Sequence, residues 1–329
     1  MKNLITCIGE ILIDFLPIDS DGSTTGFYMH PGGAPFNVAV GLAHLGQPVA
    51  FVSKVSSDYF GRYLLAYAQA QGIDTRCLLT SAAAPSTLAF VTIESGEPVF
   101  TFYGEGTADA LLHLDEIPSP CFAETSILHF GGISLLRGTT PVTVLSVVEQ
   151  LQGQALISFD PNLRPRLIRD EQSYRALLHR FFGLADVIKI SAADSAWLAP
   201  AQPVERVATE LLAQGAAFVA VTHGSAGVLA FRRTAAGQIE QWRVPAYPVA
   251  IRDTVGAGDA FSAGLLAAFV KRDVVSRATL IASAPAEIEA ALHFASAVAA
   301  LTCTQVGANP PVYAEVMRFL QAADHQHKQ

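Results

Sequence analysis

The sequence predicts an α/β protein with a doubly wound, mainly parallel sheet, helices on both faces and a small additional β-sheet. Short β-branched runs alternate with amphipathic or alanine-rich stretches over most of the 329 residues, which is the pattern of repeated strand–helix units. Most of these runs are apolar throughout, as expected for strands that helices cover on both sides. The expected strands are Leu4–Ile8, Val49–Val55, Ile127–Phe130, Ala155–Asp160, Val187–Ile190 and Phe218–Thr222. The expected helices include Ala34–Leu45, Phe60–Gln71, Pro141–Leu151, Gln172–Phe182 and Val204–Gln214.

Two segments, at about 11–33 and 88–108, interrupt this alternation because they hold extended runs with no helix between neighbours. Within the second, Val91–Glu94 and Glu97–Tyr103 flank Ser95-Gly96 and predict a hairpin. We expect one domain over residues 1–329, with these insertions forming the small sheet. That sheet is either a lid over a substrate cleft or a surface that pairs two subunits into a homodimer, and one sheet can do both.

Composition narrows the class of protein. The net charge is −8 and no run of Lys or Arg occurs, so a general nucleic-acid binder is excluded. The sequence has no apolar run of membrane-spanning length, and its first residues lack the core of a signal peptide, so we expect a soluble, cytoplasmic protein with no membrane partner. The cysteines Cys7, Cys77, Cys121 and Cys303 have no metal-site spacing and are expected to be buried thiols in a reducing compartment. The tail 325–329 is expected to be disordered.

The most informative motif is Asp253-Thr-Val-Gly-Ala-Gly-Asp259, which precedes an uncharged segment ending near residue 270. The small residues Gly256, Ala257 and Gly258 let the backbone turn sharply with its N–H groups uncovered. A buried helix beginning there presents its first N–H groups to an anion. The motif therefore predicts that these groups hold a phosphoryl group in transfer while Asp259 accepts a hydroxyl proton. The alternative for Asp259 alone is a cap on a core helix.

Other phosphate-binding designs are absent from the sequence. Phe261 stands where a dinucleotide fingerprint needs its third glycine, and no lysine follows a glycine, so there is neither a Rossmann fingerprint nor a Walker A loop. No HExxH, GxSxG or protein-kinase HRD and DFG pair occurs either. Phosphoryl transfer by this chain would use another design.

Two further glycine-rich turns are candidate ligand sites. Gly32 and Gly33 permit close approach of a ligand, and Asn37 on the following helix can bind sugar hydroxyls; the alternative is an ordinary turn. Asp14 is either a surface residue or an acceptor for two hydroxyls. The strand ending at Thr222 enters a turn that contains Gly224 and Gly227, the type of place where nucleotides bind in open α/β sheets.

Taken together, the two glycine motifs resemble the signatures of the ribokinase-like (PfkB) family of carbohydrate kinases. The first matches through Gly32-Gly33-Ala34-Pro35-Phe36-Asn37-Val38-Ala39 and Gly46, and the second through Asp253–Gly264. The resemblance covers nearly the whole chain. Gly9-Glu10, Asp14, Phe102-Tyr103, Ala108-Asp109 and Phe159-Asp-Pro-Asn162-Leu-Arg164 look like the fructokinase branch.

The resemblance implies a role for each matching residue. It makes Asp259 the catalytic base and the N–H groups of Gly256, Ala257 and Gly258 the anion hole. It places on the sugar Asp14, Gly32, Gly33, Asn37, Phe102, Asn162 and Arg164, and on ATP Lys189, Ser191, Asp194, Thr222, Gly224, Ser225, Gly227, Gly258 and Asn309. Mg²⁺ would be held through the phosphates and water near Asp194. Asp253 and the Val255 carbonyl, with the segment 302–307, would bind a monovalent cation, K⁺.

Three positions depart from the family pattern. Ser56 replaces a usual glycine, Asp194 replaces a glutamate that is one methylene longer, and Gly104 stands where many relatives carry arginine. Without that arginine an acidic sugar loses a carboxylate partner, which favours a neutral ketose and hence a fructokinase, although Arg137, Arg164 or Arg166 can compensate. The alternatives that stay open are a 2-keto-3-deoxygluconate kinase, a ribokinase or nucleoside kinase, and, remotely, a non-catalytic sugar- or nucleotide-binding protein. His223, beside the ATP turn, is expected to be structural rather than a phosphate ligand.

Overall fold

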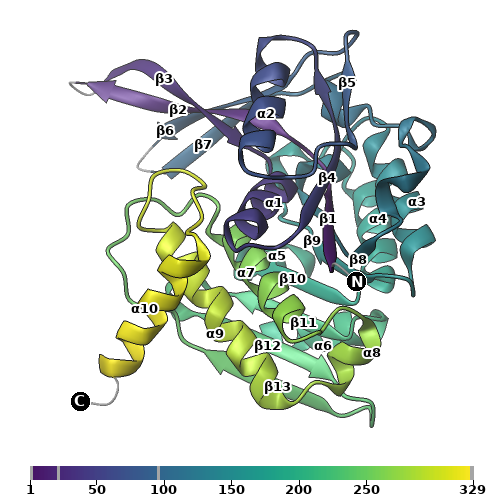
Figure 1. The fold of residues 1–329 in the computed structure, drawn as a ribbon, viewed down its shortest axis with the longest axis vertical. Coiled ribbons are helices and arrows are strands. Elements are labelled where there is room, and N and C mark those ends of the chain that lie inside the picture. Colours follow the sequence, from purple (N-terminus) through teal and green to yellow (C-terminus); the bar gives the residue numbers. More distant parts are fainter. Residues whose placement is uncertain (1–2, 21–22, 95–96, 327–329) are drawn as a thin grey trace.

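The computed structural model describes residues 3–20, 23–94 and 97–326, which form two sheets and ten α-helices in the described part of the chain (Figure 1). The strands of the large sheet are β1 (Leu4–Ile8), β4 (Val49–Ser56), β5 (Leu78–Ser81), β8 (Thr125–Gly131), β9 (Leu156–Asp160), β10 (Val187–Ser191), β11 (Phe218–Thr222), β12 (Val228–Arg233) and β13 (Ile239–Val244). The small sheet holds β2 (Leu12–Ser20), β3 (Ser23–Gly32), β6 (Thr87–Glu94) and β7 (Glu97–Tyr103). The helices are α1 (Ala34–His44), α2 (Tyr59–Ala70), α3 (Thr140–Leu151), α4 (Glu171–Leu184), α5 (Ala192–Leu198), α6 (Val204–Gln214), α7 (Ala257–Lys271), α8 (Arg277–Ala282), α9 (Pro285–Thr302) and α10 (Tyr313–Gln326).

The large sheet has the order β13-β12-β11-β10-β9-β8-β1-β4-β5. Its neighbours from β5 to β11 are parallel, whereas β11, β12 and β13 pair antiparallel. The predicted doubly wound, mainly parallel fold is therefore confirmed. Because all the parallel strands end at one edge, the turns after β1, β8, β9, β10 and β11 lie near one another there.

Successive strand residues pack into two separate cores on opposite faces of the sheet. Phe218 and Ala220 of β11, for example, belong to one core, whereas Val219 and Val221 belong to the other. Helices α1, α2, α7, α8, α9 and α10 contribute to the first core, and α3, α4, α5 and α6 to the second. Helix α7 is buried over most of its length, from Asp259 to Phe269, as its lack of charge predicts.

The small sheet is formed by the two predicted insertions and projects from the body of the molecule (Figure 1). Its order is β3-β2-β6-β7, with β2 and β6 parallel and both outer pairs antiparallel. The predicted hairpin is present as β6 and β7, which pair up to Glu94 and Glu97; the predicted turn at residues 95–96 lies outside the described residues. Side chains alternate between the two faces of this sheet, so Asp14 and Phe102 lie on one face and Phe15 and Phe90 on the other.

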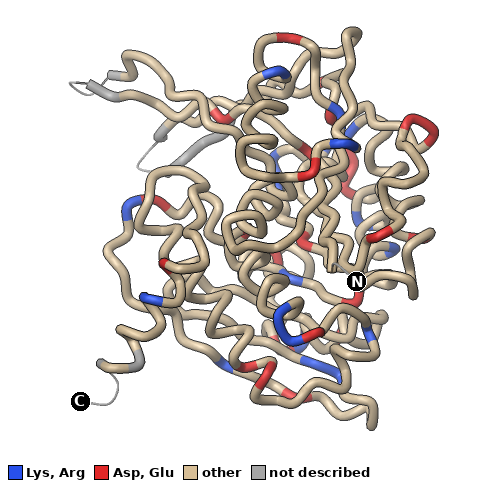
Figure 2. Tube along the Cα trace, in the orientation of Figure 1, with Lys and Arg blue, Asp and Glu red and all other residues tan. Residues whose placement is uncertain are grey.

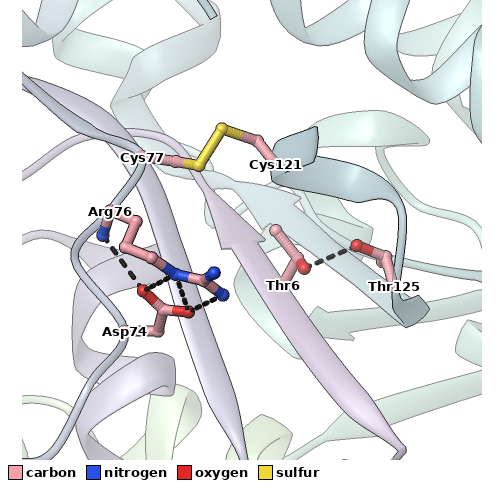
Figure 3. The surroundings of a disulfide bond; sticks show 6 residues. All are labelled: Thr6, Asp74, Arg76, Cys77, Cys121 and Thr125. Atoms are coloured by element: carbon pink, nitrogen blue, oxygen red, sulfur yellow. Dashed lines mark hydrogen bonds and ion pairs between the residues drawn. A yellow bond between two sulfur atoms is a disulfide. The ribbon is translucent and has the colours of Figure 1, made fainter. Parts of the chain in front are cut away.

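One expectation about the cysteines is wrong. Cys77 and Cys121 form a disulfide, with Cα atoms 5.9 Å apart, whereas Cys7 and Cys303 are free (Figure 3). The bond joins the start of β5 to a 3-10 turn at Ser119–Phe122, just before β8. Close by, the Thr6 and Thr125 hydroxyls hydrogen-bond at 2.7 Å (Figure 3). The loop that the disulfide closes contains both strands of the second insertion. The two cysteines are 44 residues apart in the sequence, so the sequence alone does not reveal that they are close in space.

Lysine and arginine are scattered among acidic residues in the view of Figure 2. Within the described part of the chain, no helix has the length and apolar character needed to cross a membrane. The prediction of a disordered tail is partly wrong, because His325 and Gln326 form the end of the amphipathic helix α10. Residues 327–329 lie outside the described residues.

Candidate active site

A cavity of about 440 Å³ lies at the carboxyl edge of the large sheet, between this edge and the small sheet. Its walls come from the turns after β1, β8, β9, β10 and β11, from the small sheet and from the start of α7. The predicted site residues that line it are Asp14, Gly33, Asn37, Phe102, Asn162, Arg164, Lys189, Ser191, Asp194, Thr222, Val255, Gly256, Gly258 and Asp259. The fold therefore brings both glycine motifs to one cavity.

The start of α7 has the geometry that the sequence predicts for an anion site. Gly256 is the N-cap in a left-handed conformation, with φ of 75°, which glycine adopts without steric cost. A side chain there would also lie 2.5 Å from the Cβ of Ala308. The N–H of Ala257 donates to the Thr254 carbonyl at 3.2 Å, and Ala257 does not line the cavity. Among the described residues the N–H groups of Gly256 and Gly258 have no acceptor, so both are available to an anion.

Asp259 is held by two amides that come from distant parts of the chain. Asn37 Nδ2 donates to Asp259 Oδ2 at 2.9 Å, and Asn162 Nδ2 donates to Oδ1 at 3.2 Å. Asp259 lies in the third position of α7, behind the Gly256 cap. The alternative of a simple helix cap is therefore wrong, because both carboxylate oxygens point to side chains outside the helix.

Burial sets the proton affinity of Asp259. Its side chain is buried (6% exposed), and this desolvation raises the pKa of Asp259 to about 7, against the opposing effect of the Asn37 hydrogen bond. Asp160 also raises this pKa, whereas Lys189 and Arg164 lower it. A carboxyl with a pKa near neutrality is well matched to accepting a proton at physiological pH.

Asn162 reaches Asp259 from a strained turn after β9. Its φ is 43°, which is uncommon for a residue other than glycine. Arg164 donates to the Asn162 side-chain oxygen, so the amide nitrogen is directed to Asp259. Strained backbone of this kind is found where a side chain must be held in one functional position.

Beneath the turn at Gly258 lies a buried ion pair between β9 and β10. Lys189 Nζ is 2.9 Å from Asp160 Oδ2, and both side chains are less than a tenth exposed. A Cβ on Gly258 would lie 2.7 Å from Lys189 Nζ. Only glycine therefore leaves room for the ammonium at this point. Asp160 was not among the predicted site residues.

The small sheet supplies the opposite wall of the cavity. Asp14 and Phe102 line the cavity because both occupy the face of the small sheet that points toward it. Removal from bulk water and, to a smaller extent, the Asp259 carboxylate raise the pKa of Asp14 to about 7. The two carboxyls thus face a common space from opposite sides, as a polyhydroxylated ligand would require.

Glu10 joins the walls of the cavity, although it was noted only as part of a fructokinase-like motif and was not among the predicted site residues. Its carboxylate accepts from the backbone N–H groups of Ala34 and Ser134, each at 3.0 Å. Gly33, with φ of 112°, packs so closely that a Cβ would lie 2.5 Å from the Glu10 carbonyl oxygen. An acid two residues after the strand Leu4–Ile8 was the available signal. Also missed were the cavity residues Leu12, Ala34, Gly132, Ile133, Leu163, Ala193 and Thr254.

Asp194 is a structural link in this cavity. Its Oδ2 accepts from the Ser191 N–H at 2.7 Å and the Ser191 hydroxyl at 2.6 Å, and its Oδ1 accepts from the Leu163 N–H at 3.0 Å. Both oxygens are therefore engaged by protein donors. Among the residues that the structure describes, no three His, Cys, Asp or Glu side chains gather to hold a metal ion.

Asp253 connects the two segments that were expected to hold a monovalent cation. Asp253 Oδ1 accepts from the Val255 N–H at 3.0 Å, and Oδ2 from the Gly307 N–H at 2.8 Å. The Cys303 carbonyl accepts from the Arg252 N–H at 2.8 Å. The predicted association of Asp253 with the segment 302–307 is present, and these contacts brace the Gly256 turn from behind.

Several predicted residues lie outside the cavity. Gly224, Ser225 and Gly227 follow Thr222 in a turn before β12, and Asn309 lies on the loop after Gly307. Gly32 and Asp253 are likewise absent from the lining. His223 Nε2 is buried without a hydrogen-bond partner among the described residues, and its expected structural role stays a prediction.

Gly104, one of the departures from the family pattern, is packed against arginine. The Arg137 guanidinium occupies the space into which a side chain at position 104 would extend. Its Nη2 is buried and has no hydrogen-bond partner in the described part of the chain. An arginine side chain is thus present beside Gly104, although from another segment.

Comparison with known proteins decides the family. A profile described as "pfkB family carbohydrate kinase" matches residues 2–314. The chain belongs to the pfkB family of carbohydrate kinases. This kinase is 35% identical over 330 residues to fructokinase-1 of Oryza sativa subsp. japonica, covering 98% of this chain and 99% of the relative. It is 34% identical over 275 residues to a fructokinase of Rhizobium leguminosarum bv. trifolii, covering 83% of this chain and 82% of the relative.

Solved structures place the kinase beside fructokinases as well. A fructokinase with bound ATP from Xylella fastidiosa superposes with a TM-score of 0.90 at 32% identity, covering 98% of this chain and all of that chain (100%). A fructokinase double mutant from Vibrio cholerae O395, with fructose, ADP and potassium ion bound, gives a TM-score of 0.85 at 31% identity, with 97% and 98% covered. The predicted family and fold are confirmed.

Proposed function

We propose that this kinase is an ATP-dependent fructokinase, which transfers the γ-phosphoryl group of ATP to the primary hydroxyl of fructose and forms fructose 6-phosphate. The observation that carries the proposal is the position of Asp259, a buried carboxyl with a pKa of about 7 directly behind the two free N–H groups of the Gly256–Gly258 turn. Full-length similarity to fructokinases supports fructose as the acceptor.

In this mechanism Asp259 accepts the proton of the sugar hydroxyl. The oxygen of that hydroxyl forms the new bond to phosphorus while the bond from phosphorus to ADP breaks. The N–H groups of Gly256 and Gly258 stabilise the charge on the transferred group. Asn37 and Asn162 keep the carboxylate oriented. The sugar lies between Asp14, Gly33, Phe102 and Arg164, which line the cavity.

ATP would extend from Lys189 and Ser191 past Thr222 toward the Gly224–Gly227 turn and Asn309. Mg²⁺ supplies charge neutralisation between the phosphates when bound, and we propose that it is held by phosphate oxygens and water, because Asp194 already accepts protein hydrogen bonds at both oxygens. Potassium would bind beside Asp253 and the Val255 carbonyl and steady the turn, and the potassium ion in the Vibrio cholerae fructokinase supports this assignment.

A second candidate acceptor is 2-keto-3-deoxygluconate. The buried, unpaired Nη2 of Arg137 beside Gly104 favours it, because an acidic sugar brings a carboxylate that pairs well with a guanidinium. Arg137 does not line the cavity, so fructose remains the first choice.

A coupled ADP-release assay tests both candidates. Purified protein is given ATP, Mg²⁺ and K⁺ with fructose, 2-keto-3-deoxygluconate, ribose, adenosine or glucose in turn, and Asp259→Asn serves as the inactive control. We expect the highest kcat/KM with fructose. A higher value with 2-keto-3-deoxygluconate would reassign the acceptor, and loss of that preference in Arg137→Met would attribute it to this residue. Absence of turnover with every acceptor would refute the proposal.

The proposed roles of the small sheet are a lid over the cavity, within one domain spanning residues 1–329, and a contact between subunits. Exclusion of water favours transfer to the sugar over hydrolysis. The outer face carries Phe15, Phe27, Phe90 and Tyr103 in ring contact, with Phe27 and Tyr103 exposed, and exposed aromatic surface is typical of interfaces. Light scattering of the purified protein is expected to give the mass of a homodimer. The mass of a monomer even at high protein concentration would refute the contact.

We propose that the protein acts in the cytoplasm, where ATP is supplied. A disulfide is more typical of oxidising compartments, so the state of Cys77 and Cys121 in cells is a direct test. Alkylation of the thiols in intact cells before lysis is expected to label both cysteines, and recovery of the bonded pair together with extracytoplasmic protein would refute this location.

A further inference from the structure

The ion pair beneath the Gly258 turn has a role beyond packing. We propose that Asp160 is a positioning residue of the reaction, which holds the Lys189 ammonium against Gly258, between the anion-binding turn and Asp259. The inference rests on the proposed function, because it takes Asp259 as the base.

The geometry supports this assignment from three sides of Asp160. Its Oδ2 is 2.9 Å from Lys189 Nζ on β10 and 3.4 Å from the Ser262 hydroxyl on α7, and its Oδ1 accepts from the Asn162 N–H at 3.2 Å. Asp160 thus touches the strand that carries Lys189, the helix that carries Asp259 and the turn that carries Asn162. Asp160 and Lys189 are also next in register after the pair Phe159 and Ile188.

Lys189 retains capacity to bind a ligand. Asp160 is the one hydrogen-bond acceptor of its ammonium among the residues described here, which leaves two of its three N–H donors. Lys189 also lines the cavity, so its charge acts on a phosphoryl group at the turn as well as on Asp259. Burial disfavours the charged ammonium, but Asp160, together with Asp194 and Asp259, raises the pKa of Lys189, so the ammonium stays protonated.

Stability alone gives little reason for such a pair. Two buried charges pay a desolvation cost that their attraction often fails to exceed, so well-packed apolar residues would serve the fold equally well. A single uncompensated charge next to Asp259 would instead be strongly unfavourable. The pair is therefore best explained by the position of its positive end at the reacting group.

The proposal makes opposite predictions for the two members of the pair. Asp160→Asn removes a negative charge near Asp259, and Lys189→Met removes a positive one. The other charged groups around Asp259 and Lys189 stay in place in both variants; these are Glu10, Asp14, Arg164 and Asp194. In a plot of kcat/KM against pH, the midpoint of the acid limb gives the pKa of the base in the free enzyme. We expect it near pH 7 in the wild type, lower by about one pH unit in Asp160→Asn and higher by about one in Lys189→Met.

The experiment measures kcat/KM for the acceptor from pH 5 to 9 in these proteins, with Ser262→Ala as a matched control that touches Asp160 without changing charge. We also expect kcat of Asp160→Asn to fall roughly 10²-fold, the effect of a displaced reacting group, with the KM for the acceptor unchanged. A limb that moves in the same direction in both variants, or in neither, would overturn the inference. If the wild type itself lacks turnover, the proposed function fails and not the pairing.

Where Asp160→Asn does not fold, because it leaves a buried ammonium unpaired, the double variant Asp160→Asn/Lys189→Met is measured instead. It carries neither charge, so the two shifts oppose one another and the acid limb is expected near that of the wild type. Its kcat is still expected to fall roughly 10²-fold, because the cation is gone from the turn. A double variant with wild-type kcat would show that the pair is structural only.

Discussion

Replacing Asp259 by asparagine is expected to slow the kinase and at the same time to stabilise its fold. The side chain is 6% exposed, and burial raises the pKa of its carboxyl from 3.8 to about 7. Above neutral pH the folded protein therefore holds an ionised group in surroundings that favour the neutral form. An amide of the same shape removes this charge. Its oxygen can face Asn162, whose own oxygen is held by Arg164, while Asn37 turns its amide to receive the new N–H group.

The size of the gain follows from the pKa. The folded-state value lies about three pH units above the ordinary one, and each unit corresponds to about 1.4 kcal/mol, so the charge costs about 4 kcal/mol once it is fully formed. Between about pH 4 and 7 the unfolded chain binds fewer protons than the folded one, so the free energy of unfolding decreases as the pH rises through this range. Asp259→Asn is expected to be more stable than wild type by about 4 kcal/mol at pH 8 and by about 2 kcal/mol at pH 5.

Urea unfolding at the two pH values measures the difference. Asp115→Asn is a matched control, because Asp115 is exposed on a 3-10 turn remote from the cavity lining; we expect no gain from it at either pH. The turnover of Asp259→Asn is expected to be lower by about 10²–10⁴-fold, the range for a positioned base. A variant that is less stable than wild type at pH 8, or one with wild-type turnover, would refute the reasoning.

Three other substitutions test the surrounding structure. Gly256→Ala is expected to cost at least about 1–2 kcal/mol of stability, the cost of a φ of 75°, with the clash against Ala308 in addition, and to lower kcat at least tenfold. Gly237→Ala, at a φ of 79° with open space around it, should lose stability alone. Equal kcat losses in the two variants would contradict this. Asn162→Gly relieves a φ of 43° but removes an amide from the base, so thermal unfolding should show unchanged or higher stability while kcat falls; a destabilised variant with full kcat would argue against the strained turn. The Cys77→Ser/Cys121→Ser double variant opens a loop of 44 residues, for which chain entropy gives a decrease of about 4 kcal/mol in the free energy of unfolding. Urea unfolding without reductant measures this decrease. If reductant does not cause the same decrease in the wild type, the entropic origin is contradicted.

The local parts of this molecule are readable from the sequence. The turn at Gly256 and the uncharged helix behind it lie within one continuous segment, so composition alone predicts both. Six of the nine strands described in the large sheet are likewise marked by short apolar runs, and their bounds differ from the predicted ones by at most two residues, whereas β5, β12 and β13 were not predicted with bounds. Local patterns of this kind depend on neighbours in the sequence, which are always visible.

The side-chain contacts that orient the groups in the cavity join residues that are far apart in the sequence. Asn37 and Asn162 meet at Asp259 across 222 and 97 residues, and no periodicity marks them as partners. The resemblance to a family placed both near the sugar, whereas the structure shows each of them bonded to Asp259. Asp194 was expected near Mg²⁺, yet its oxygens are occupied by the backbone of Leu163 and by Ser191. Side-chain partners such as these depend on the tertiary fold.

The order of strands in the large sheet has a consequence for how the chain is made. After β1, β4 and β5, each strand from β8 to β13 pairs on one side with a strand already synthesised, so the sheet can grow outward at a single edge as the chain leaves the ribosome. Asp160 and Lys189 are in place early in that sequence, before α7 exists. Asp259 is added only after the last strand, and the Gly307 contact to Asp253 comes later still. A nascent chain stopped after β13 would therefore hold a complete sheet and no base, and the kinase gains its chemistry only in the last stage of translation.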